Sequence, residues 1–507
     1  KNPLPFITGT ICAHNCMTKC MRNYYDEPVN IRATKLVAAE RGYDDYMAKI
    51  KAPVPVTDGR KVAVIGGGPT GMAAAYFVGR AGIPVTIFER SGVLGGVVRQ
   101  VIPAFRISDD AIDHDVALMF KMGVEVKLNT EAPSVAELKA QGYTHIFFAV
   151  GAWKAGRLDI PGNVVPVIGW LKDMKAGKDV SLGHVAVVGG GNTAMDAARA
   201  ALRAGAKSST LVYRRTKKYM PADAEELEMA IADGVEFLEL VAPVEQKDGK
   251  LVCEKMKLGD PDEKGRRKPV PTGEMVEIPC DTVVSAVGEK VESEVFTQNG
   301  ITVDEKGIPD FKTNLEGVYA GGDAMRGPAT VVEGIADAQY FANAVIGEAH
   351  KFAIPGKAVA TREESIAKKG ILCESAKCEG DRCLTCNVVC QVCADVCPNR
   401  ANVVIELPDG RQQILHVDRM CNECGNCAVF CPYDSAPYRD KFTLFLTREG
   451  FDESAQNRGF LPLGGKKVLV RLNGRVFEAD LDGKNDLPAD IEVFIWTVLT
   501  KYAYLLG

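Results

Sequence analysis

Two groups of cysteines near the end of the chain limit what it can fold into more than any other feature. They are Cys383-x2-Cys386-x3-Cys390-x2-Cys393-x3-Cys397-Pro398 and Cys421-x2-Cys424-x2-Cys427-x3-Cys431-Pro432. The second group has the spacing that binds two [4Fe-4S] clusters, in which three cysteines hold one cluster and the fourth serves its neighbour. Zinc is the alternative for isolated Cys-x2-Cys pairs, but the full spacing favours iron and sulfide. We therefore predict that this part of the chain carries single electrons.

In the first cysteine group, the spacing does not determine which cysteine is the first ligand. The spacing of the second group would require a cysteine at residue 387, which is asparagine. Cys386, one residue earlier, is our choice, and Cys383 is the alternative. Cys373 and Cys378 do not fit the spacing. The predicted ligands of the two clusters are Cys386, Cys390, Cys393, Cys397, Cys421, Cys424, Cys427 and Cys431.

Composition and charge exclude several classes of protein. The 507 residues carry a net charge of −5, so the basic surface of a nucleic-acid-binding protein is absent. No apolar run approaches the roughly 18 residues that span a bilayer. Of the 16 cysteines, all but Cys253 and Cys280 lie in residues 12–20 and 373–431, and no secretory segment precedes them. We expect metal ligation in a reducing cytoplasm. The chain begins without Met, as a piece of a longer polypeptide would.

The first of two glycine turns predicts a dinucleotide site. Gly66-Gly67-Gly68-Pro69-Thr70-Gly71 fits G-x-G-x-x-G and directly follows the apolar strand Val62–Ile65. Such glycines allow a tight turn and a close approach of the backbone to a pyrophosphate, which faces the N-terminus of the next helix. A second strand ends at Glu89, an acid placed to bind ribose hydroxyls. Arg90, Gly96 and Val97 are further candidates for contacts with this cofactor.

The second glycine turn has a different partner at its second strand. Gly189-Gly190-Gly191-Asn192-Thr193-Ala194 follows the strand Val185–Val188, and the next strand ends in Arg214-Arg215 rather than in an acid. Arginines at this position accommodate a 2′-phosphate, which favours NADP(H) over NAD(H). A solvated cationic edge is the alternative. The candidate contacts are Gly190, Gly191, Asn192, Thr193, Asp196, Arg214 and Arg215.

A third segment has the residue order of flavoproteins. Leu315–Ala320 reads as a short strand that delivers Gly322 and Asp323 toward a ribityl chain, and Ala329 and Thr330 then open a helix. The N-terminus of that helix could face the pyrimidine end of a flavin, where negative charge develops on reduction. Glu333 is a candidate nicotinamide contact. Its alternative is a solvated helix acid without a function.

These motifs together resemble one family. The chain is similar to the small subunit of bacterial glutamate synthase and its relatives, including the flavin–iron–sulfur half of dihydropyrimidine dehydrogenase and the bifurcating ferredoxin–NADP transhydrogenase. The similarity covers about residues 5–350. Its matching stretches are Gly9-Thr10-Ile11-Cys12…Cys16…Cys20, Val62–Gly71, Ile102–Arg106, Val187–Arg199, Tyr213-Arg214-Arg215…Met220-Pro221-Ala222 and Tyr319–Asp323. The fused tail looks most like the flavoprotein subunits named after selenate reductase, and no selenate chemistry is inferred from that name.

The resemblance implies FAD at the first glycine turn and NADPH at the second. It also implies that Cys12, Cys16 and Cys20 ligate clusters close to the flavin. In the family the remaining ligands lie upstream and just downstream, and Lys35 falls near the position of a Gln or Glu ligand. These N-terminal clusters are therefore either incomplete here or dependent on a segment that this chain lacks. By the same likeness Arg106 would lie between flavin and cluster, and a surface or pairing arginine is an equal alternative.

The predicted fold is α/β. It contains two Rossmann-like domains, of which the resemblance implies that the second is inserted in the first. A helical N-terminal iron–sulfur segment and an α+β ferredoxin-like domain with two [4Fe-4S] clusters complete it. The expected boundaries are an iron–sulfur segment at 1–55, an FAD domain at 56–170 and 285–355, and a NAD(P)H domain at 171–284. The ferredoxin-like domain is expected at 370–440, and a hairpin and helix at 441–507.

The predicted chemistry follows from the combination of cofactors. A nicotinamide gives up a hydride, a cubane takes one electron, and a flavin converts between them. We expect an NAD(P)H:acceptor oxidoreductase that passes electrons from FAD through clusters to a partner protein, or runs in reverse. A disulfide reductase is excluded because no cysteine pair follows Gly96-Val97. The alternative from another class is an electron-relay or assembly subunit with an idle nicotinamide site.

Overall fold

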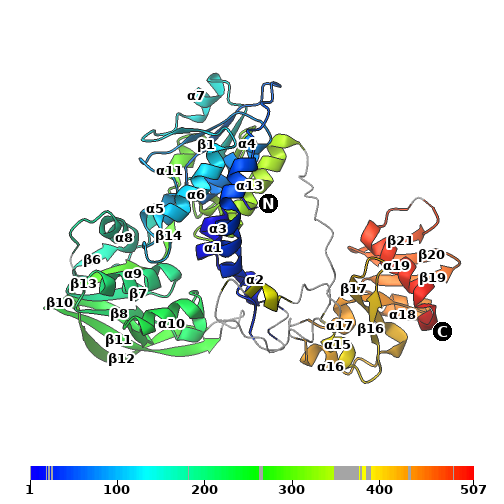
Figure 1. Ribbon diagram of the computed structural model, residues 1–507. Helices are drawn as coiled ribbons and strands as arrows, with labels where there is room; N and C mark the ends of the chain where they lie inside the picture. Colours follow the sequence, from blue (N-terminus) through cyan, green and yellow to red (C-terminus); the bar gives the residue numbers. More distant parts are fainter. Residues whose placement is uncertain are drawn as a thin grey trace. The chain divides into compact units, whose positions relative to one another are not determined.

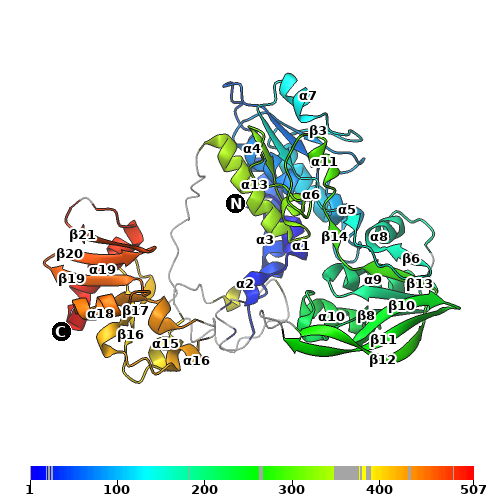
Figure 2. The ribbon, with the colours of Figure 1, turned by 180° about the vertical axis from the view of Figure 1, so that it is seen from behind.

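The computed structural model describes residues 2–18, 20, 23, 27–180, 182–261, 267–347, 376, 379–383, 390–431, 435–483 and 485–506. The chain divides into two compact units. The first consists of Lys1–Asn15 and Ile31–Ala353, and the second of Cys16–Asn30 and Ile354–Gly507. Figures 1 and 2 show the elements from opposite sides. In the described part, no helix combines the length and the apolar character that crossing a bilayer requires.

A parallel sheet forms the centre of the first unit. Its strand order is β15-β4-β1-β2-β3, and every pair is parallel. The central strands are apolar and buried along their whole length, which is typical of strands covered on both faces. The strands are β1 (Val62–Ile65), β2 (Val85–Phe88), β3 (Glu125–Lys127), β4 (His145–Phe148) and β15 (Val318–Ala320).

Helices cover both faces of this sheet. On one face the rings of Phe147 and Phe341 stack at 4.4 Å, and Met72 is fully buried in the same cluster. On the other face Leu138 and Phe296 pack in a second cluster with Phe148. The helices of this part are α4 (Pro69–Arg80), α5 (Gly96–Gln100), α6 (Asp109–Phe120), α7 (Val135–Ala140), α11 (Glu294–Thr297), α12 (Asp323–Arg326) and α13 (Val331–Ile346).

A second parallel sheet, of order β6-β13-β7-β8-β9, lies between β4 and β15 in the sequence. Three helices pack on one face through an apolar cluster that includes Leu211, and a three-stranded antiparallel sheet packs near the other through one that includes Leu251. The parallel strands are β6 (Val164–Pro166), β7 (His184–Gly189), β8 (Ser208–Tyr213), β9 (Glu236–Glu239) and β13 (Thr282–Ala286). The remaining elements are α8 (Val167–Lys175), α9 (Asn192–Arg203), η2 (Lys217–Tyr219), α10 (Ala224–Ala232), β10 (Val241–Lys247), β11 (Lys250–Pro261) and β12 (Arg267–Pro279).

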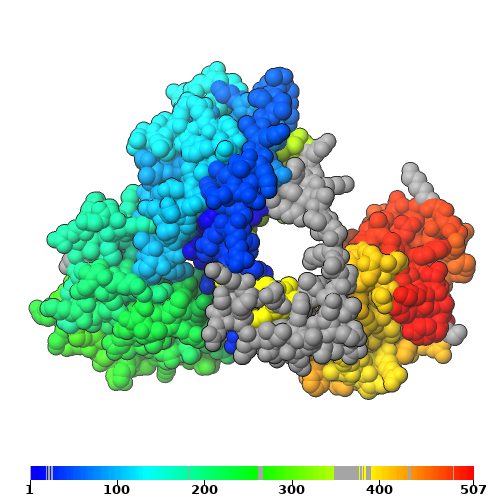
Figure 3. All heavy atoms as spheres, viewed as in Figure 1, coloured from blue at the N-terminus to red at the C-terminus, as the bar shows by residue number. Residues whose placement is uncertain are grey.

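The two parallel sheets are joined by a pair of short strands. β5 (Lys154–Ala155) leaves the first sheet, β14 (Glu289–Lys290) returns to it, and the two pair antiparallel. The second α/β part is therefore an insertion into the first, as the sequence predicts. In the space-filling view the cyan surface of the first part and the green surface of the second meet directly (Figure 3). The predicted α/β class is confirmed.

The N-terminal helices of the first unit are α1 (Pro5–Ile11) and α3 (Ile31–Lys49), separated by α2 (Asn15–Thr18). Asp115 of α6 holds the start of α1, because its two carboxylate oxygens accept hydrogen bonds from the amides of Phe6 (3.1 Å) and Ile7 (2.8 Å). Burial raises the pKa of Asp115 to about 7. The carboxylate thus fixes the segment that leads to Cys12.

The second unit contains one mixed sheet of order β16-β17-β18-β19-β20-β21. The sheet continues past residue 440, where the sequence predicts the end of the ferredoxin-like domain. Strand β17 of the β16–β17 hairpin pairs in parallel with β18, which follows that residue. The last hairpin turns at Asn473-Gly474, whose φ angles of 51° and 73° suit the two-residue turn that this dipeptide predicts. The strands are β16 (Asn402–Glu406), β17 (Gln412–Val417), β18 (Phe442–Leu444), β19 (Gly459–Gly464), β20 (Lys467–Leu472) and β21 (Arg475–Asp480).

Helix α19 (Ala489–Lys501) buries Phe494, Ile495 and Val498 in the cluster that also contains Leu415 of β17. The C-terminal helix and the β16–β17 hairpin therefore share one apolar core. The other helices of this unit are short. They are η3 (Glu379–Arg382), α15 (Val392–Asp395), η4 (Asp418–Met420), α16 (Asn426–Val429), α17 (Pro437–Asp440), α18 (Arg448–Glu453) and η5 (Ala503–Leu506).

Candidate flavin, nicotinamide and cluster sites

The first glycine turn joins β1 to α4, and its glycines meet different surroundings. Gly66 has a φ of +103°, and a Cβ there would lie 2.5 Å from the carbonyl oxygen of Ala149. A Cβ on Gly71 would lie 1.9 Å from the carbonyl oxygen of Gly66. Around Gly68, by contrast, the nearest atom to an added Cβ is the Cα of Gly96, at 3.8 Å. The outer glycines are needed by the protein itself, and the middle one leaves an open face for a ligand.

Glu89, at the end of β2, braces this turn. Its carboxylate is 6% exposed and accepts hydrogen bonds from the amides of Gly67 and Ser91, each at 2.7 Å. A carboxylate has about four acceptor positions, so a ribose hydroxyl can still bind to it. The ribose contact stays a prediction, and the bracing of the turn is an additional role.

A cavity of about 590 Å³ opens at this turn. Its size is that of a pocket for a large cofactor. Eleven residues predicted for the flavin site line it, namely Gly66, Gly68, Pro69, Thr70, Glu89, Arg90, Gly96, Val97, Asp323, Ala329 and Thr330. Gly71 and Gly322 do not line it. Sequence reasoning missed further lining residues, among them Trp153 and Lys172. The open face of Gly68, the N-terminus of α4 and the cavity's size fit FAD.

Trp153 and Lys172 come from two different parts of the first unit. Trp153 follows β4, and its indole ring lies 5.6 Å from the guanidinium of Arg90 and 5.8 Å from the ammonium group of Lys172 in α8. Neither distance is readable from sequence, because it depends on how the inserted part packs. The sequence around Trp153 contains no motif that indicates a cofactor contact.

The Gly-Gly-Asp turn is held by a buried carboxylate that pairs with an exposed arginine. Asp337 of α13 is 1% exposed and accepts hydrogen bonds from the amide of Gly322 (3.0 Å) and from Nε of Arg326 (2.7 Å). A second bond from Arg326 makes the pair bidentate. Gly322 has a φ of +66°, and a Cβ there would lie 2.3 Å from Oγ1 of Thr70. Gly322 therefore lets this turn pack on the first glycine turn.

Asp323 lies beside the cavity next to two other carboxylates. Burial raises its pKa to about 6, with further increases from Glu289 and Glu333, and a hydrogen bond from the amide of Ala329 (3.1 Å) opposes the shift. Asp323 is therefore partly protonated near neutral pH and can both donate and accept hydrogen bonds there.

Glu333 caps α13. Its carboxylate accepts hydrogen bonds from the amide (2.9 Å) and hydroxyl (2.7 Å) of Thr330, whose hydroxyl in turn accepts from the amide of Glu333. This reciprocal arrangement is a capping box. The hydrogen bonds from Thr330 lower the pKa of Glu333. Glu333 does not line the cavity, so its nicotinamide contact stays a prediction.

The second glycine turn joins β7 to α9. A Cβ on Gly189 would lie 2.2 Å from the carbonyl oxygen of Ala286, and one on Gly190 would lie 2.4 Å from the ring of Tyr213. A Cβ on Gly191 would meet nothing within 4 Å. The open glycine is thus the last one before the helix, as at Gly68. Asn192 accepts a hydrogen bond from the amide of Asp223 (3.1 Å) and is partly committed to the protein.

The two arginines at the end of β8 differ in burial. Arg214 is exposed, whereas Arg215 is half-buried and its Nε has no hydrogen-bond partner among the residues that the structure describes. A buried guanidinium nitrogen without a partner is costly. A phosphate placed at this strand end would satisfy it. This donor set fits a 2′-phosphate.

Arg106 and Asp196 contact each other. Nη1 of Arg106 donates to Asp196 of α9 (2.7 Å) and to Glu226 of α10 (2.5 Å), and both carboxylates are buried. The adjacent Phe105 lies under the guanidinium groups of Arg199 and Arg203 of α9. Burial raises the pKa of Asp196 to about 6, against the opposing effect of Arg106. The pairing alternative for Arg106 is present. The flavin contact of Arg106 and the cofactor contact of Asp196 stay predictions.

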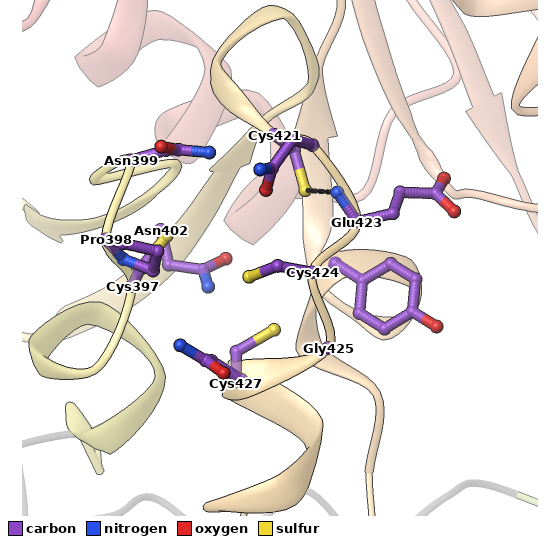
Figure 4. Close-up of a pocket in the computed structure, with 12 residues that line it drawn as sticks. Cys397, Pro398, Asn399, Asn402, Cys421, Glu423, Cys424, Gly425 and Cys427 are labelled. Carbon is purple, nitrogen blue, oxygen red and sulfur yellow. Dashed lines mark hydrogen bonds between the residues drawn. The ribbon is translucent and has the colours of Figure 1, made fainter.

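Four cysteines line one small cavity in the second unit. Cys421, Cys424 and Cys427 come from the second group, and Cys397 is the last cysteine of the first group. Figure 4 shows the sulfurs of Cys421, Cys424 and Cys427 directed into a common space, across which Cys397 lies. The amide of Glu423 donates to Sγ of Cys421 (3.3 Å), and that of Ala401 donates to Sγ of Cys397 (3.2 Å).

Cys390 and Cys431, two further cysteines of these groups, lie near Cys393. Burial raises the pKa of the Cys393 thiol to about 11, and the neighbouring thiols of Cys390, Cys427 and Cys431 add to the rise. The carbonyl of Cys393 accepts a hydrogen bond from Asn402 (3.0 Å), which in turn bonds to the buried His416. Burial lowers the pKa of His416 to about 4. Cys373, Cys378 and Cys386 lie outside the described residues.

The three N-terminal cysteines fall on both sides of the division between the units. Cys12, in the first unit, is buried, and its Sγ accepts a hydrogen bond from Nζ of Lys35 (3.3 Å). Lys35 also donates to the carbonyl of Thr8 (3.2 Å). Cys16 and Cys20 belong to the second unit. Among the described residues, no three His, Cys, Asp or Glu side chains are gathered tightly enough for one metal ion.

Comparisons with known proteins assign the chain to one family. Residues 60–338 match the pyridine nucleotide-disulphide oxidoreductases. The oxidoreductase YgfK of Escherichia coli K12 is 40% identical, over all of this chain and 52% of that protein. Subunit beta of the NADPH-Fe(3+) oxidoreductase of Geobacter sulfurreducens is 36% identical, over 71% of this chain and 60% of that protein. The small chain of the NADPH glutamate synthase of Escherichia coli K12 is 30% identical, over 68% of this chain and 80% of that protein.

The chain matches only part of the length of two of these relatives. The chain spans about half the length of YgfK and three fifths of the Geobacter subunit. None of the three is a selenate reductase subunit, so that part of the expectation stays a prediction. The residues that match the family model, 60–338, include both glycine turns. The chain belongs to the pyridine nucleotide-disulphide oxidoreductase family, with the glutamate synthase small chain among its relatives.

Proposed function

We propose that the chain accepts hydride from NADPH at FAD and passes single electrons through two [4Fe-4S] clusters to a partner protein. The observation that carries the proposal is the 590 Å³ cavity, which eleven predicted flavin residues line in the same compact unit as the second glycine turn. The cysteine-lined cavity of the second unit adds the single-electron carrier. FAD, when bound, converts the two electrons of a hydride into single electrons.

The residues of the first unit would bind and orient both nucleotides. Gly68 would let the FAD pyrophosphate approach the backbone, and the N-terminus of α4 would face its charge. The capped N-terminus of α13, at Thr330, would face the pyrimidine end of the flavin. Asp323, with its pKa near 6, would exchange hydrogen bonds with the ribityl hydroxyls. At the other turn, Gly191 and α9 would hold the NADPH pyrophosphate.

The cysteines of the second unit would form two ligand sets that exchange their last members. Cys421, Cys424, Cys427 and Cys397 would bind one cluster, and Cys386, Cys390, Cys393 and Cys431 would bind the other. The amides of Glu423 and Ala401, which donate to cysteine sulfurs, would stabilise the added electron on the first of these clusters. A cubane spans several irons, so its cysteine sulfurs stand farther apart than the ligands of a single ion.

The partner is proposed from the relatives' names. The Geobacter protein is a subunit of an NADPH-Fe(3+) oxidoreductase, and the Escherichia coli protein is the small chain of an NADPH glutamate synthase. Both are therefore parts of larger assemblies. We propose that the electrons of this chain likewise leave to another subunit, or to a further part of a longer chain like YgfK.

Anaerobic titration with NADPH tests the function. We expect flavin absorbance to bleach first, and the EPR signals of reduced [4Fe-4S] clusters to follow in the same sample. Iron and sulfide counts give the number of clusters. A flavin that stays oxidised with both NADPH and NADH would overturn the proposal and support the relay subunit with an idle nicotinamide site.

Replacing both Arg214 and Arg215 with alanine tests the choice of nicotinamide. We expect the Kd of NADPH to rise about 100-fold, because charge-assisted bonds to a phosphate contribute roughly 1.5–3 kcal/mol. The Kd of NADH should change less than about threefold. The measurement is stopped-flow reduction of the flavin at several nicotinamide concentrations. Lys207→Ala, an exposed cation at the opposite end of β8, is the matched control. An equal loss for NADPH and NADH would contradict the assignment.

A further inference from the structure

A buried asparagine lies beside the cysteine-lined cavity of the second unit. The four cysteines of this cavity, here called the Cys421 set, are Cys397, Cys421, Cys424 and Cys427. Asn402, the first residue of β16, lines the same cavity and is 3% exposed. In Figure 4 its carboxamide is directed into the space that the cysteine sulfurs share. Because a buried amide needs hydrogen-bond partners, its contacts show what it can still bind.

The backbone places Asn402 next to Cys397. The amide of Arg400, which has a φ of +54°, donates to the carbonyl of Cys397 (3.1 Å), so the chain turns sharply after this cysteine. Asn402 then pairs with His416 across the β16–β17 hairpin. The side chain of Asn402 is therefore held between the last cysteine of the first group and the strand that leads to the second group.

Two hydrogen bonds orient the carboxamide. Nδ2 of Asn402 donates to the carbonyl oxygen of Cys393 (3.0 Å), which can only accept, so the amino group faces that side. Oδ1 then faces Nδ1 of His416 at 3.0 Å, and this ring nitrogen carries the proton and donates. His416 is 2% exposed, and burial lowers its pKa to about 4, so its ring is neutral. One orientation of the amide satisfies both partners.

One hydrogen of this amide remains for the cavity. An amide nitrogen carries two hydrogens, and the carbonyl of Cys393 accepts one of them. The backbone amides of Glu423 and Ala401 already donate to cysteine sulfurs of the Cys421 set. The second hydrogen of Asn402 would add a donor from a side chain. Unlike the backbone donors, it can be removed by substitution.

We propose that Asn402 donates a hydrogen bond to the iron–sulfur cluster held by the Cys421 set and raises the reduction potential of that cluster. The inference rests on the clusters of the proposed function. On reduction, one electron supplied by the flavin enters the cluster, no bond forms or breaks, and the charge of the cluster becomes more negative by one. A buried, oriented donor stabilises this added charge. His416 acts through Asn402 as a positioning residue.

An electrochemical titration of the full chain with EPR detection tests the proposal without NADPH. The signal of the Cys421 set is the one that Cys424→Ala loses and Cys390→Ala keeps. In Asn402→Leu we expect the ratio of reduced to oxidised cluster at a given potential to fall about tenfold, because hydrogen bonds to charged groups are strong. For one electron this corresponds to a midpoint lower by about 59 mV. The signal that Cys390→Ala loses should shift less.

Two further variants separate the hydrogen bond from the packing of the domain. His416→Leu keeps Asn402 but removes the bond that orients its amide, so we expect a smaller decrease of the same midpoint. Gln413→Leu removes an exposed carboxamide from β17, outside the cavity, and should leave both midpoints unchanged. If Asn402→Leu does not retain its iron, an unchanged midpoint in an iron-replete His416→Leu overturns the proposal.

The outcomes distinguish this inference from the function on which it rests. An unchanged midpoint in Asn402→Leu, with full iron and sulfide content, would overturn the role of Asn402 alone. An equal shift of both signals would also overturn it, because the substitution would then have loosened the whole domain. The absence of any iron–sulfur signal from the unaltered chain would overturn the proposed function together with the inference.

Discussion

Gly68→Ala should leave the protein folded and weaken its FAD binding strongly. The backbone of Gly68, with φ of −74° and ψ of −179°, is one that alanine adopts freely. An added Cβ would meet no protein atom closer than 3.8 Å. The methyl group would instead occupy the face along which a pyrophosphate approaches the backbone. We expect the Kd of FAD to rise about 100-fold or more, which corresponds to roughly 2.7 kcal/mol.

The contrast with Gly71→Ala makes this result specific. At Gly71 the added Cβ would lie 1.9 Å from the carbonyl oxygen of Gly66, a backbone atom that cannot move without opening the turn. We expect the free energy of unfolding of the apoprotein to fall by about 3 kcal/mol or more. Gly68→Ala should change it by less than about 1 kcal/mol. Both quantities come from urea unfolding of the FAD-free proteins, and the Kd comes from flavin titration.

Gly42→Ala is the control for both substitutions. Gly42 lies in α3, and a Cβ there would meet nothing within 4 Å. Alanine in a helix is favoured over glycine by roughly 0.5–1 kcal/mol. This variant should therefore bind FAD normally and unfold at a slightly higher urea concentration. Normal FAD affinity in Gly68→Ala would mean that the pyrophosphate does not lie at this turn.

The glycine turns could be located from sequence because each depends on local backbone geometry. A strand, a turn with positive φ and a helix follow one another within about 20 residues, and the spacing of the glycines records all three. The sequence does not show which glycines are required by packing within the protein and which leave space for a ligand. An added Cβ would collide with the carbonyl oxygen of Gly66 at Gly71, with the ring of Tyr213 at Gly190, and with Thr70 at Gly322. The last two contacts join residues that are far apart in the sequence.

The protein partners of charged residues are harder to predict from sequence than the positions of glycine turns. The sequence offered Glu333, Asp196 and Arg106 as contacts of the cofactors, and in the structure each has protein partners. No sequence motif points to Asp337, whose carboxylate accepts a hydrogen bond from the Gly-Gly-Asp turn. A carboxylate's partner depends on which helices pack together, and sequence spacing does not specify that. The C-terminal tail shows the same limit, since the Asn473-Gly474 hairpin was visible but its sheet with β16 and β17 was not.

Arg106→Ala should be among the most destabilising single substitutions in the first unit. Asp196 and Glu226 have side chains that are 9% and 4% exposed, and the guanidinium of Arg106 lies between them. Removing it leaves two buried carboxylates close together. The remaining cation is Arg199, whose Nη1 lies 3.9 Å from Glu226 and offsets part of their repulsion. The removal of one partner from a buried ion pair costs about 3–5 kcal/mol. Arg157→Ala, which breaks an exposed pair with Asp159, should cost less than about 0.5 kcal/mol.

The pH dependence of this loss identifies its cause. The pKa of Asp196 is raised from 3.8 to about 6 in the folded chain, so folding binds a proton between these values and stability falls as the pH rises through them. Without Arg106 the pKa rises further, because its attraction no longer favours the charged form. Urea unfolding should therefore show a larger deficit at pH 8 than at pH 5. Adding Glu226→Gln to Arg106→Ala should recover much of the loss at pH 8. A deficit that is equal at both pH values would mean that packing around Phe105, and not charge, is what Arg106 supplies.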